Sequence, residues 1–183
     1  MTVGDVVEEY LYVDVNGQER RISEAWRNKP ALVLWLRHFG CRFFQESALD
    51  ISTLAVSCVD RGLRLVVVVQ GTAEEAALLA SFENVLTVPD PTRRSYVSAG
   101  LGKTTWRAIF FPNRSLRSRR KSANARGCAI DMKRTKMKSS DPLQLPGAAL
   151  VDQTGTVRWF HNGRHTGNLD TTVALLDLLP PIH

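Results

Sequence analysis

The sequence lacks any long hydrophobic run. Its longest uninterrupted apolar stretches, Ala31–Leu36 and Leu65–Val69, fall far short of the roughly 20 residues that a membrane-spanning helix requires. The first residues, Met1 to Asp5, also lack the basic and apolar pattern of a signal peptide. We therefore expect a cytoplasmic protein with no membrane segment and no membrane partner.

Cysteine is scarce as well. Cys41, Cys58 and Cys128 are the three cysteines of the chain, and an odd, small number argues against a disulfide scaffold. In the absence of an export signal we interpret them as reduced thiols. No Cys/His spacing indicates a structural zinc site, and no cofactor is expected.

The positive charge is unevenly distributed. The 183 residues contain 24 Lys or Arg and 18 Asp or Glu, for a net charge of +6. Between Lys103 and Lys138 there are 12 basic residues and one acidic residue, Asp131, a local charge of +11 that leaves −5 for the rest of the chain. Any argument for binding a polyanion therefore depends on this one run.

The N-terminal half alternates strand and helix patterns. A hairpin is predicted over Glu9–Val15 and Glu19–Ile22, joined at Asn16-Gly17. The apolar runs Ala31–Leu36 and Leu65–Val69 are typical of strands buried on both faces. Between them, an apolar stripe at spacings of four and three residues predicts an amphipathic helix that Gly62 ends. The stripe consists of Phe44, Ala48, Ile51, Ala55 and Cys58.

The pattern continues beyond residue 70. Thr72-Ala73-Glu74-Glu75 is a capping box that opens a helix to about Phe82, and a short strand is expected over Leu86–Val88. Asp90-Pro91 would cap a helix to about Gly100, with the proline at its first position. Ala148–Val151 and Thr156–His161 predict a second hairpin, and Asp170–Leu179 a closing helix. These elements predict an α/β fold with a mixed sheet, in one domain spanning residues 1–183.

Cys41 is the strongest candidate for chemistry. It follows a buried strand and precedes a helix, the place where an open α/β sheet presents its ligand site. Unpaired backbone N–H groups and the positive charges of Arg37, His38 and Arg42 would stabilise a thiolate there, with a pKa below the free value of about 8.5. The alternative is a small apolar core residue.

The other two thiols are weaker candidates. Cys58 belongs to the apolar stripe and is interpreted as packing; about 25 Å of helix separates it from Cys41, too far for a disulfide. Cys128 lies in the basic run between Arg126 and Lys133. It is either a mobile resolving thiol or an exposed, incidental cysteine.

Three segments resemble the peroxiredoxin-like branch of the AhpC/TSA family, within the thioredoxin-like superfamily. They are the opening Val3–Asp5 with Val13–Gly17 and Pro30–Cys41, the segment Asp90–Leu101, and the segment Gln144–Gly155. The likeness covers nearly the whole chain except an insertion at about residues 103–143. It implies a thioredoxin fold whose cysteine at the helix start attacks a peroxide, becoming a sulfenic acid that a second thiol reduces.

The sequence departs from the family pattern at several positions. Ordinary peroxiredoxins have a proline seven residues before the cysteine, a threonine three before it and an arginine near the penultimate strand; here these positions hold Leu34, His38 and Pro146. The Cys-x-x-Cys pair of many relatives is also absent, because Cys41 is followed by Arg42-Phe43-Phe44. A thioredoxin-type disulfide reductase is therefore not expected.

Other residues of this sequence could take over the roles of the missing family residues. Arg37, His38, Arg42, Arg93 and Arg94 are the candidates to bind the substrate or an anion in place of the missing residues. His38 would tune the Cys41 thiolate, because histidine titrates near neutrality. Thioredoxin-like folds hold a cis-proline facing the catalytic cysteine, and Pro146 lies at or next to that position, so the resemblance makes it a further candidate for substrate or anion binding. Its peptide bond is left open between cis and trans.

The basic run allows three interpretations: a nucleic-acid surface, a solvated insertion, or a lid without periodic structure that closes over Cys41 and selects an anionic substrate or an acidic partner. Nucleic acid is not favoured, because the nearby aromatic residues, Trp106, Phe110 and Phe111, precede the dense part of the run, Arg114 to Lys138, rather than alternating with its cations.

The resemblance as a whole predicts a one-cysteine peroxidase. Its substrate would be a peroxide or related electrophile, its reductant an external thiol such as thioredoxin or glutathione, and its assembly a homodimer. Two alternatives are an inactive binding or scaffold module, and a specialised biosynthetic reductase using the same thiol.

Overall fold

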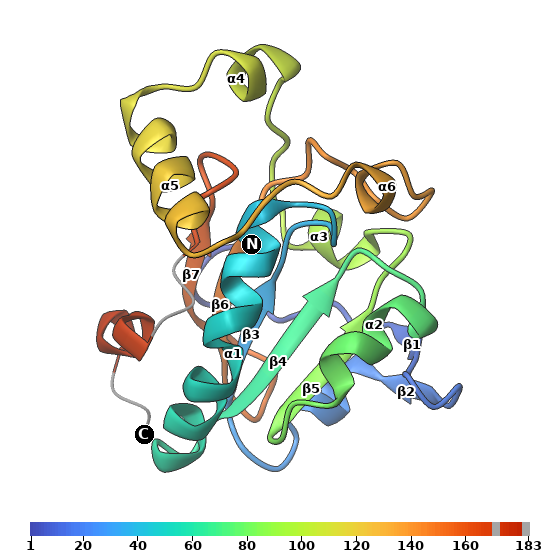
Figure 1. The fold of residues 1–183 in the computed structure, drawn as a ribbon. Coiled ribbons are helices and arrows are strands. Elements are labelled where there is room, and N and C mark those ends of the chain that lie inside the picture. The colour runs from blue at the N-terminus through green and yellow to red at the C-terminus, as the bar shows by residue number, and fades with distance from the viewer. Residues whose placement is uncertain (170–172, 181–183) are drawn as a thin grey trace.

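A five-stranded mixed sheet forms the centre of the protein in a computed structural model, which describes residues 1–169 and 173–180 (Figure 1). The strand order is β5-β4-β3-β6-β7. The strands are β3 (Ala31–Trp35), β4 (Arg64–Val69), β5 (Val85–Pro89), β6 (Gly147–Val151) and β7 (Val157–Asn162). β3, β4 and β5 run parallel, and β6 and β7 join antiparallel. The predicted α/β fold with a mixed sheet is confirmed.

Each face of the sheet is covered by its own hydrophobic cluster. Helices α1 (Arg42–Asp60) and α2 (Ala73–Ala80) pack on the face that presents Leu32 and Leu34. The opposite face presents Val33 and Trp35 to the N-terminal hairpin β1–β2 (Leu11–Val13, Glu19–Arg21), to η1 (Ile22–Ala25) and to α3 (Arg94–Ser98). Burial on both faces explains why β3 and β4 are continuous apolar runs.

The elements around α1 form as the sequence predicts. Helix α1 ends where Gly62 adopts a left-handed φ of +71°, the usual conformation just past a helix C-terminus. Thr72 and Glu75 make a reciprocal capping box at the start of α2: the Glu75 N–H donates to Thr72 Oγ1 at 3.3 Å, and the Thr72 N–H donates to Glu75 Oε2 at 2.9 Å.

Helix α3 begins later than predicted. Its N-cap is Arg93, in the left-handed region at φ 60°, so Pro91 does not occupy the first helical position. The Asp90 carboxylate still caps the helix, since it accepts the N–H groups of Arg94 at 3.0 Å and Ser95 at 2.9 Å.

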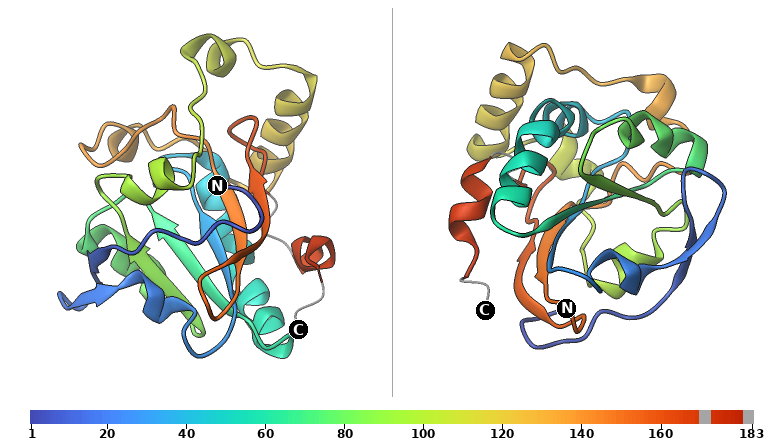
Figure 2. Two further views of the ribbon diagram at one scale, coloured as in Figure 1. Left: turned by 180° about the vertical axis from the view of Figure 1, so that it is seen from behind. Right: turned by 90° about the horizontal axis from the view of Figure 1, so that it is seen from below.

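The insertion (residues 103–143) is helical, which corrects the expectation of a lid without periodic structure. It contains α4 (Trp106–Phe110), α5 (Arg114–Ala125) and α6 (Met132–Thr135). Side chains of Thr105, Asn113 and Asp131 cap the three helices. α5 buries only Leu116 and Ala123, so its sequence lacks a continuous apolar stripe like that of α1. α4 and α5 project from the rest of the fold in Figure 1 and in the left view of Figure 2.

The C-terminal part differs in two details. The closing element is a 3-10 helix, η2 (Val173–Leu178), rather than an α-helix, and the predicted start at residues 170–172 lies outside the described residues. The Leu145–Pro146 bond is trans, as no cis peptide occurs in the described ranges. No helix among the residues described is long and apolar enough to cross a membrane.

Candidate active site

Cys41 lies at the junction between the central strand and the longest helix. It is the N-cap residue of α1, and its N–H donates to the His38 carbonyl at 2.9 Å, closing a tight turn after β3. Its side chain is 7% exposed. The first turn of α1 directs backbone N–H groups toward this end, which favours a negative charge.

Cys41 lines a cavity of about 400 Å³ between this turn and the insertion. Most of the cavity wall is apolar. It comes from Phe43 at the start of α1, from Trp106, Ile109 and Phe110 of α4, and from Ile130 and Met132 next to and within α6. The insertion therefore covers the cysteine, as one of the three interpretations of the basic run predicts.

Gly40 shows how closely the insertion approaches the cysteine. A Cβ at this position would collide with the Thr135 side chain and backbone and with the Asp131 carbonyl. The Asp131 N–H donates to the Gly40 carbonyl at 3.0 Å. α6 and its N-cap residue Asp131 thus pack directly against the turn that precedes Cys41.

Arg37 and His38 border the cavity but are both buried. The Arg37 guanidinium donates to the carbonyls of Gln144 and Pro142, the latter at 2.7 Å, and so ties the end of β3 to the segment before β6. Burial, assisted by the charge of Arg37, lowers the pKa of His38 to about 3, while Asp141 acts in the opposite direction. His38 is therefore neutral at physiological pH, which corrects the expectation that it titrates near neutrality.

Two other arginines flank the thiol. Arg42 lines the cavity and donates to the Asn124 side chain on α5. Arg120 on α5 also lines it and donates to the Ile109 carbonyl at 2.6 Å. Burial and the charge of Arg42 lower the pKa of Arg120, whereas Cys41 acts in the opposite direction.

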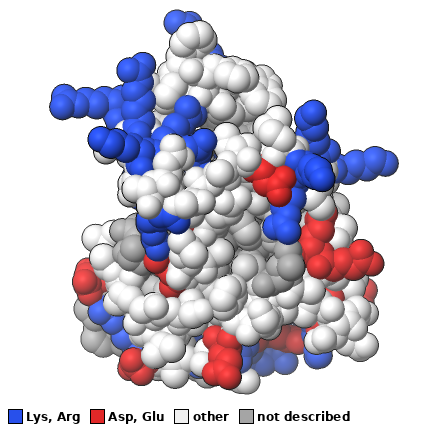
Figure 3. All heavy atoms as spheres, in the orientation of Figure 1, with Lys and Arg blue, Asp and Glu red and all other residues white. Residues whose placement is uncertain are grey.

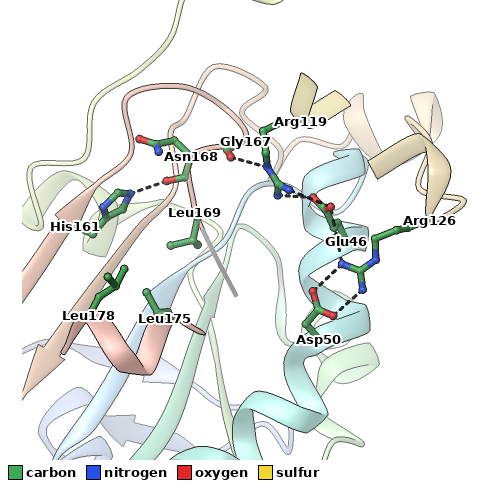
Figure 4. Close-up of a pocket in the computed structure, with 10 residues that line it drawn as sticks. All are labelled: Glu46, Asp50, Arg119, Arg126, His161, Gly167, Asn168, Leu169, Leu175 and Leu178. Atoms are coloured by element: carbon green, nitrogen blue, oxygen red, sulfur yellow. Dashed lines mark hydrogen bonds and ion pairs between the residues drawn. The ribbon is translucent and has the colours of Figure 1, made fainter. Parts of the chain in front are cut away.

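A second cavity, of about 410 Å³, is lined by residues of α1 and of α5, among others (Figure 4). Arg119 of α5 donates to both carboxylate oxygens of Glu46, at 2.7 and 3.3 Å, and Arg126 forms a two-fold contact with Asp50 at 2.6 and 2.8 Å. Because these charges are paired with one another, we interpret this cavity as a clamp between α1 and α5. The clamp holds α5 on α1, and α5 carries Arg120, which lines the cavity of Cys41.

The other predicted site residues lie elsewhere. Arg93 donates to the Ser139 carbonyl at 2.8 Å, and Arg94 pairs with Glu8 at 2.7 Å. The Pro146 carbonyl accepts the Gly163 N–H at 3.0 Å. None of the three lines the cavity at Cys41, and their role in binding remains a prediction.

The two remaining thiols are buried. Cys58 packs in the core as expected, and burial raises its pKa to about 12. Cys128 is 4% exposed, which corrects the expectation of an exposed, incidental cysteine. The loop after α5 packs against α1, where the Ala129 N–H donates to the Gln45 side chain at 3.0 Å. Burial raises the pKa of Cys128, which disfavours its thiolate.

Sequence reasoning missed Arg120 and the apolar wall of the cavity. Arg120 is one of many basic residues in the run, and Trp106, Ile109 and Phe110 carry no local signal that places them opposite a cysteine more than sixty positions earlier. The clustering of aromatic residues just before Arg114, where the cations become dense, is the one feature that could have suggested a binding surface.

Known proteins resemble this chain in both sequence and fold. A prostamide/prostaglandin F synthase from Salmo salar is 34% identical over 56 residues, which cover 31% of this chain and 28% of that protein. The matched segment thus covers less than a third of that relative's length. Peroxidoxin BcpB from Mycobacterium tuberculosis superposes with a TM-score of 0.63 at 13% identity, covering 99% of each chain. Peroxiredoxin 5 from Alvinella pompejana gives 0.62 at 11% identity, covering 97% of this chain and 96% of its own.

The family assignment follows from a match that extends over more than half of the sequence. Residues 50–165 match the AhpC/TSA antioxidant enzyme family. The match begins after Cys41 and includes the whole insertion. Together with the thioredoxin-like fold, it shows that this chain is a peroxiredoxin-like member of the AhpC/TSA family.

Proposed function

We propose that this protein is a thiol peroxidase that reduces an organic hydroperoxide, with Cys41 as its nucleophile and an external thiol as its reductant. The observation that carries the proposal is the position of Cys41 at the start of α1, lining a largely apolar cavity of about 400 Å³ beside Arg42 and Arg120. An apolar wall suits the organic part of a hydroperoxide better than hydrogen peroxide, which has none.

The chemistry needs one thiol in the protein. The Cys41 thiolate attacks the terminal oxygen of the hydroperoxide, an S–O bond forms, the O–O bond breaks, and the alkoxide takes up a proton and leaves as an alcohol. An external thiol then converts the sulfenic acid to a mixed disulfide and water. A second external thiol attacks the mixed disulfide, which releases the Cys41 thiolate and the disulfide of the two external thiols.

Arg120 and Arg42 are the residues that would stabilise charge during the first step. Both are cations on the wall of the cavity that Cys41 also lines. Fixed positive groups aimed at developing charge lower the barrier of such a step. They would take the place of the threonine and arginine that ordinary peroxiredoxins have, whereas Arg37 is committed to backbone carbonyls.

We also propose that residues 1–183 act as one functional domain, in line with the sequence-based expectation. The cavity has one wall from the β3–α1 junction and another from the insertion. Neither part encloses the thiol alone.

The test is peroxide consumption with cumene hydroperoxide and with hydrogen peroxide, using dithiothreitol, glutathione and thioredoxin as reductants. We expect turnover of the organic hydroperoxide, its loss in Cys41→Ser, and its retention in Cys58→Ala, which removes a thiol from the core. Mass spectrometry should find the added oxygen on Cys41. Equal consumption by wild type and Cys41→Ser would overturn the proposal, and consumption no faster than without protein would favour a binding or scaffold module.

A specialised reductase that uses the same thiol is the second candidate. It is favoured by the segment shared with the prostamide/prostaglandin F synthase and by the apolar wall of the cavity. Reduction of a cyclic endoperoxide in the same assay, with no turnover of the open-chain hydroperoxide, would select it over the peroxidase.

A further inference from the structure

We propose that the tip of the insertion binds to an anionic lipid surface, so that the cavity of Cys41 opens toward the membrane. This departs from the sequence-based expectation of no membrane partner. The binding itself goes beyond the proposed function; only its consequence for the substrate rests on it.

The first observation is a group of exposed large apolar side chains on one part of the molecule. Trp106, Phe110 and Phe111 are 53%, 70% and 76% exposed, and Ile130 and Met132 are 51% and 57% exposed. Trp106 and Phe110 stack on each other, with ring centroids 6.1 Å apart. Large apolar side chains gathered on a surface mark an interaction site, whereas isolated ones are ordinary.

The second observation is the charge around this group. Figure 3 shows blue side chains on both flanks of the projecting upper part of the molecule, with mostly uncharged surface between them. Eight cations of the insertion have no acidic partner within 4 Å in the part of the chain that the structure describes. Six of these are Arg107, Arg114, Arg117, Lys121, Lys133 and Lys136; the other two are Arg120, on the wall of the Cys41 cavity, and Lys138. The remainder of the protein is net acidic.

An apolar tip flanked by unpaired cations complements a bilayer with anionic headgroups. The aromatic rings suit the headgroup and acyl boundary, and Lys and Arg are attracted to the surface potential of anionic lipids. A single-stranded nucleic acid also suits cations and aromatic rings. Ile130 and Met132 favour lipid, because aliphatic side chains offer no ring on which bases stack.

The position of the patch gives it a functional consequence. Trp106, Phe110, Ile130 and Met132 belong both to the exposed patch and to the wall of the Cys41 cavity. A membrane that contacts the patch therefore faces the mouth of the cavity. If the proposed peroxidase is correct, its substrates are hydroperoxides of membrane lipids, which would reach Cys41 along an apolar path.

The binding test is co-sedimentation with phosphatidylcholine vesicles and with vesicles that also contain phosphatidylglycerol. We expect binding to the anionic vesicles, weakened by salt, and little binding to phosphatidylcholine alone. Cys41→Ser should bind as the wild type does, so a failure of the proposed chemistry leaves this result unaffected. Vesicles should also shift the tryptophan emission to shorter wavelength, and Trp106→Phe should remove most of the shift.

Matched variants separate the patch from general effects. Phe110→Ser with Phe111→Ser should abolish vesicle binding, whereas Val97→Ser, at a residue 71% exposed on α3, should not change it. Removing two cations in Arg107→Gln with Arg114→Gln should weaken binding roughly 30-fold, since each cation near the surface contributes about a factor of five. The same change at the exposed Arg21 and Arg27 should have little effect.

Equal binding by wild type and the Phe110/Phe111 variant would overturn the proposal, as would an absence of binding to anionic vesicles at low salt. Retention of single-stranded DNA at the same salt without vesicle binding would assign the patch to nucleic acid instead.

Discussion

The clamp between Glu46 and Arg119 predicts an asymmetric loss of stability. The Glu46 side chain is 5% exposed and that of Arg119 is 37% exposed. Arg119→Gln leaves a buried carboxylate whose other cation, Arg126, is 3.9 Å away. Glu46→Gln instead leaves a half-exposed guanidinium that water can solvate. Arg119→Gln should therefore destabilise the protein more than Glu46→Gln.

The burial of the pair sets the expected magnitude. Exposed ion pairs contribute up to about 1 kcal/mol, and breaking a fully buried pair costs about 3–5 kcal/mol. With one buried and one half-exposed partner, we expect about 2 kcal/mol for Arg119→Gln and about 1 kcal/mol for Glu46→Gln. For a protein of this size, the larger change lowers the Tm by roughly 4–8 °C. The double variant should resemble Glu46→Gln, because the buried charge is gone.

Urea unfolding followed by tryptophan fluorescence measures these free energies. Limited proteolysis should also cut α5 faster in Arg119→Gln, because that helix loses a contact with α1. The control is Arg61→Gln, whose partner Asp177 is 71% exposed, with an expected cost below about 0.5 kcal/mol. If Arg119→Gln costs no more than Glu46→Gln, the carboxylate is not desolvated and the reasoning about the clamp fails.

Three further predictions follow from the site. Because the folded-state pKa of His38 is about 3, the unfolded chain takes up a proton below about pH 6.5 that the folded chain does not. Stability should then fall by about 2 kcal/mol from pH 7 to pH 5, and His38→Asn should remove most of this fall; an unchanged fall in urea titrations would contradict the assignment. Cys128 is buried and its pKa is raised, so iodoacetamide should label Cys41 first in the native protein. The variant Cys128→Ala should keep the wild-type turnover with dithiothreitol. A Cys41–Cys128 disulfide after peroxide treatment would show instead that Cys128 is the resolving thiol. Gly40→Ala should destabilise the protein by about 1–3 kcal/mol, because the added methyl group collides with Thr135, and wild-type stability in thermal unfolding would refute that contact.

Local sequence patterns predicted the strands and helix ends that depend only on neighbouring residues. The runs at Ala31–Leu36 and Leu65–Val69 predicted β3 and β4 because strands covered on both faces are apolar throughout. The capping box at Thr72 and the glycine at residue 62 located helix ends through backbone geometry that involves only neighbouring residues. The start of α3 was predicted too early, because Asp90 caps from outside a turn whose left-handed residue, Arg93, has no sequence signature.

The sequence by itself determined the mixed α/β sheet, the position of Cys41 after β3 and at the start of α1, and the concentration of positive charge in one segment. The tertiary structure alone decided what that segment does. It folds the insertion into helices, holds α5 on α1 through Glu46, and brings Trp106 and Arg120 to the cavity of Cys41. The physical reason is that backbone geometry and hydrophobic periodicity are local, whereas a cavity is closed by contacts between residues more than sixty positions apart in the chain, for which no short pattern exists.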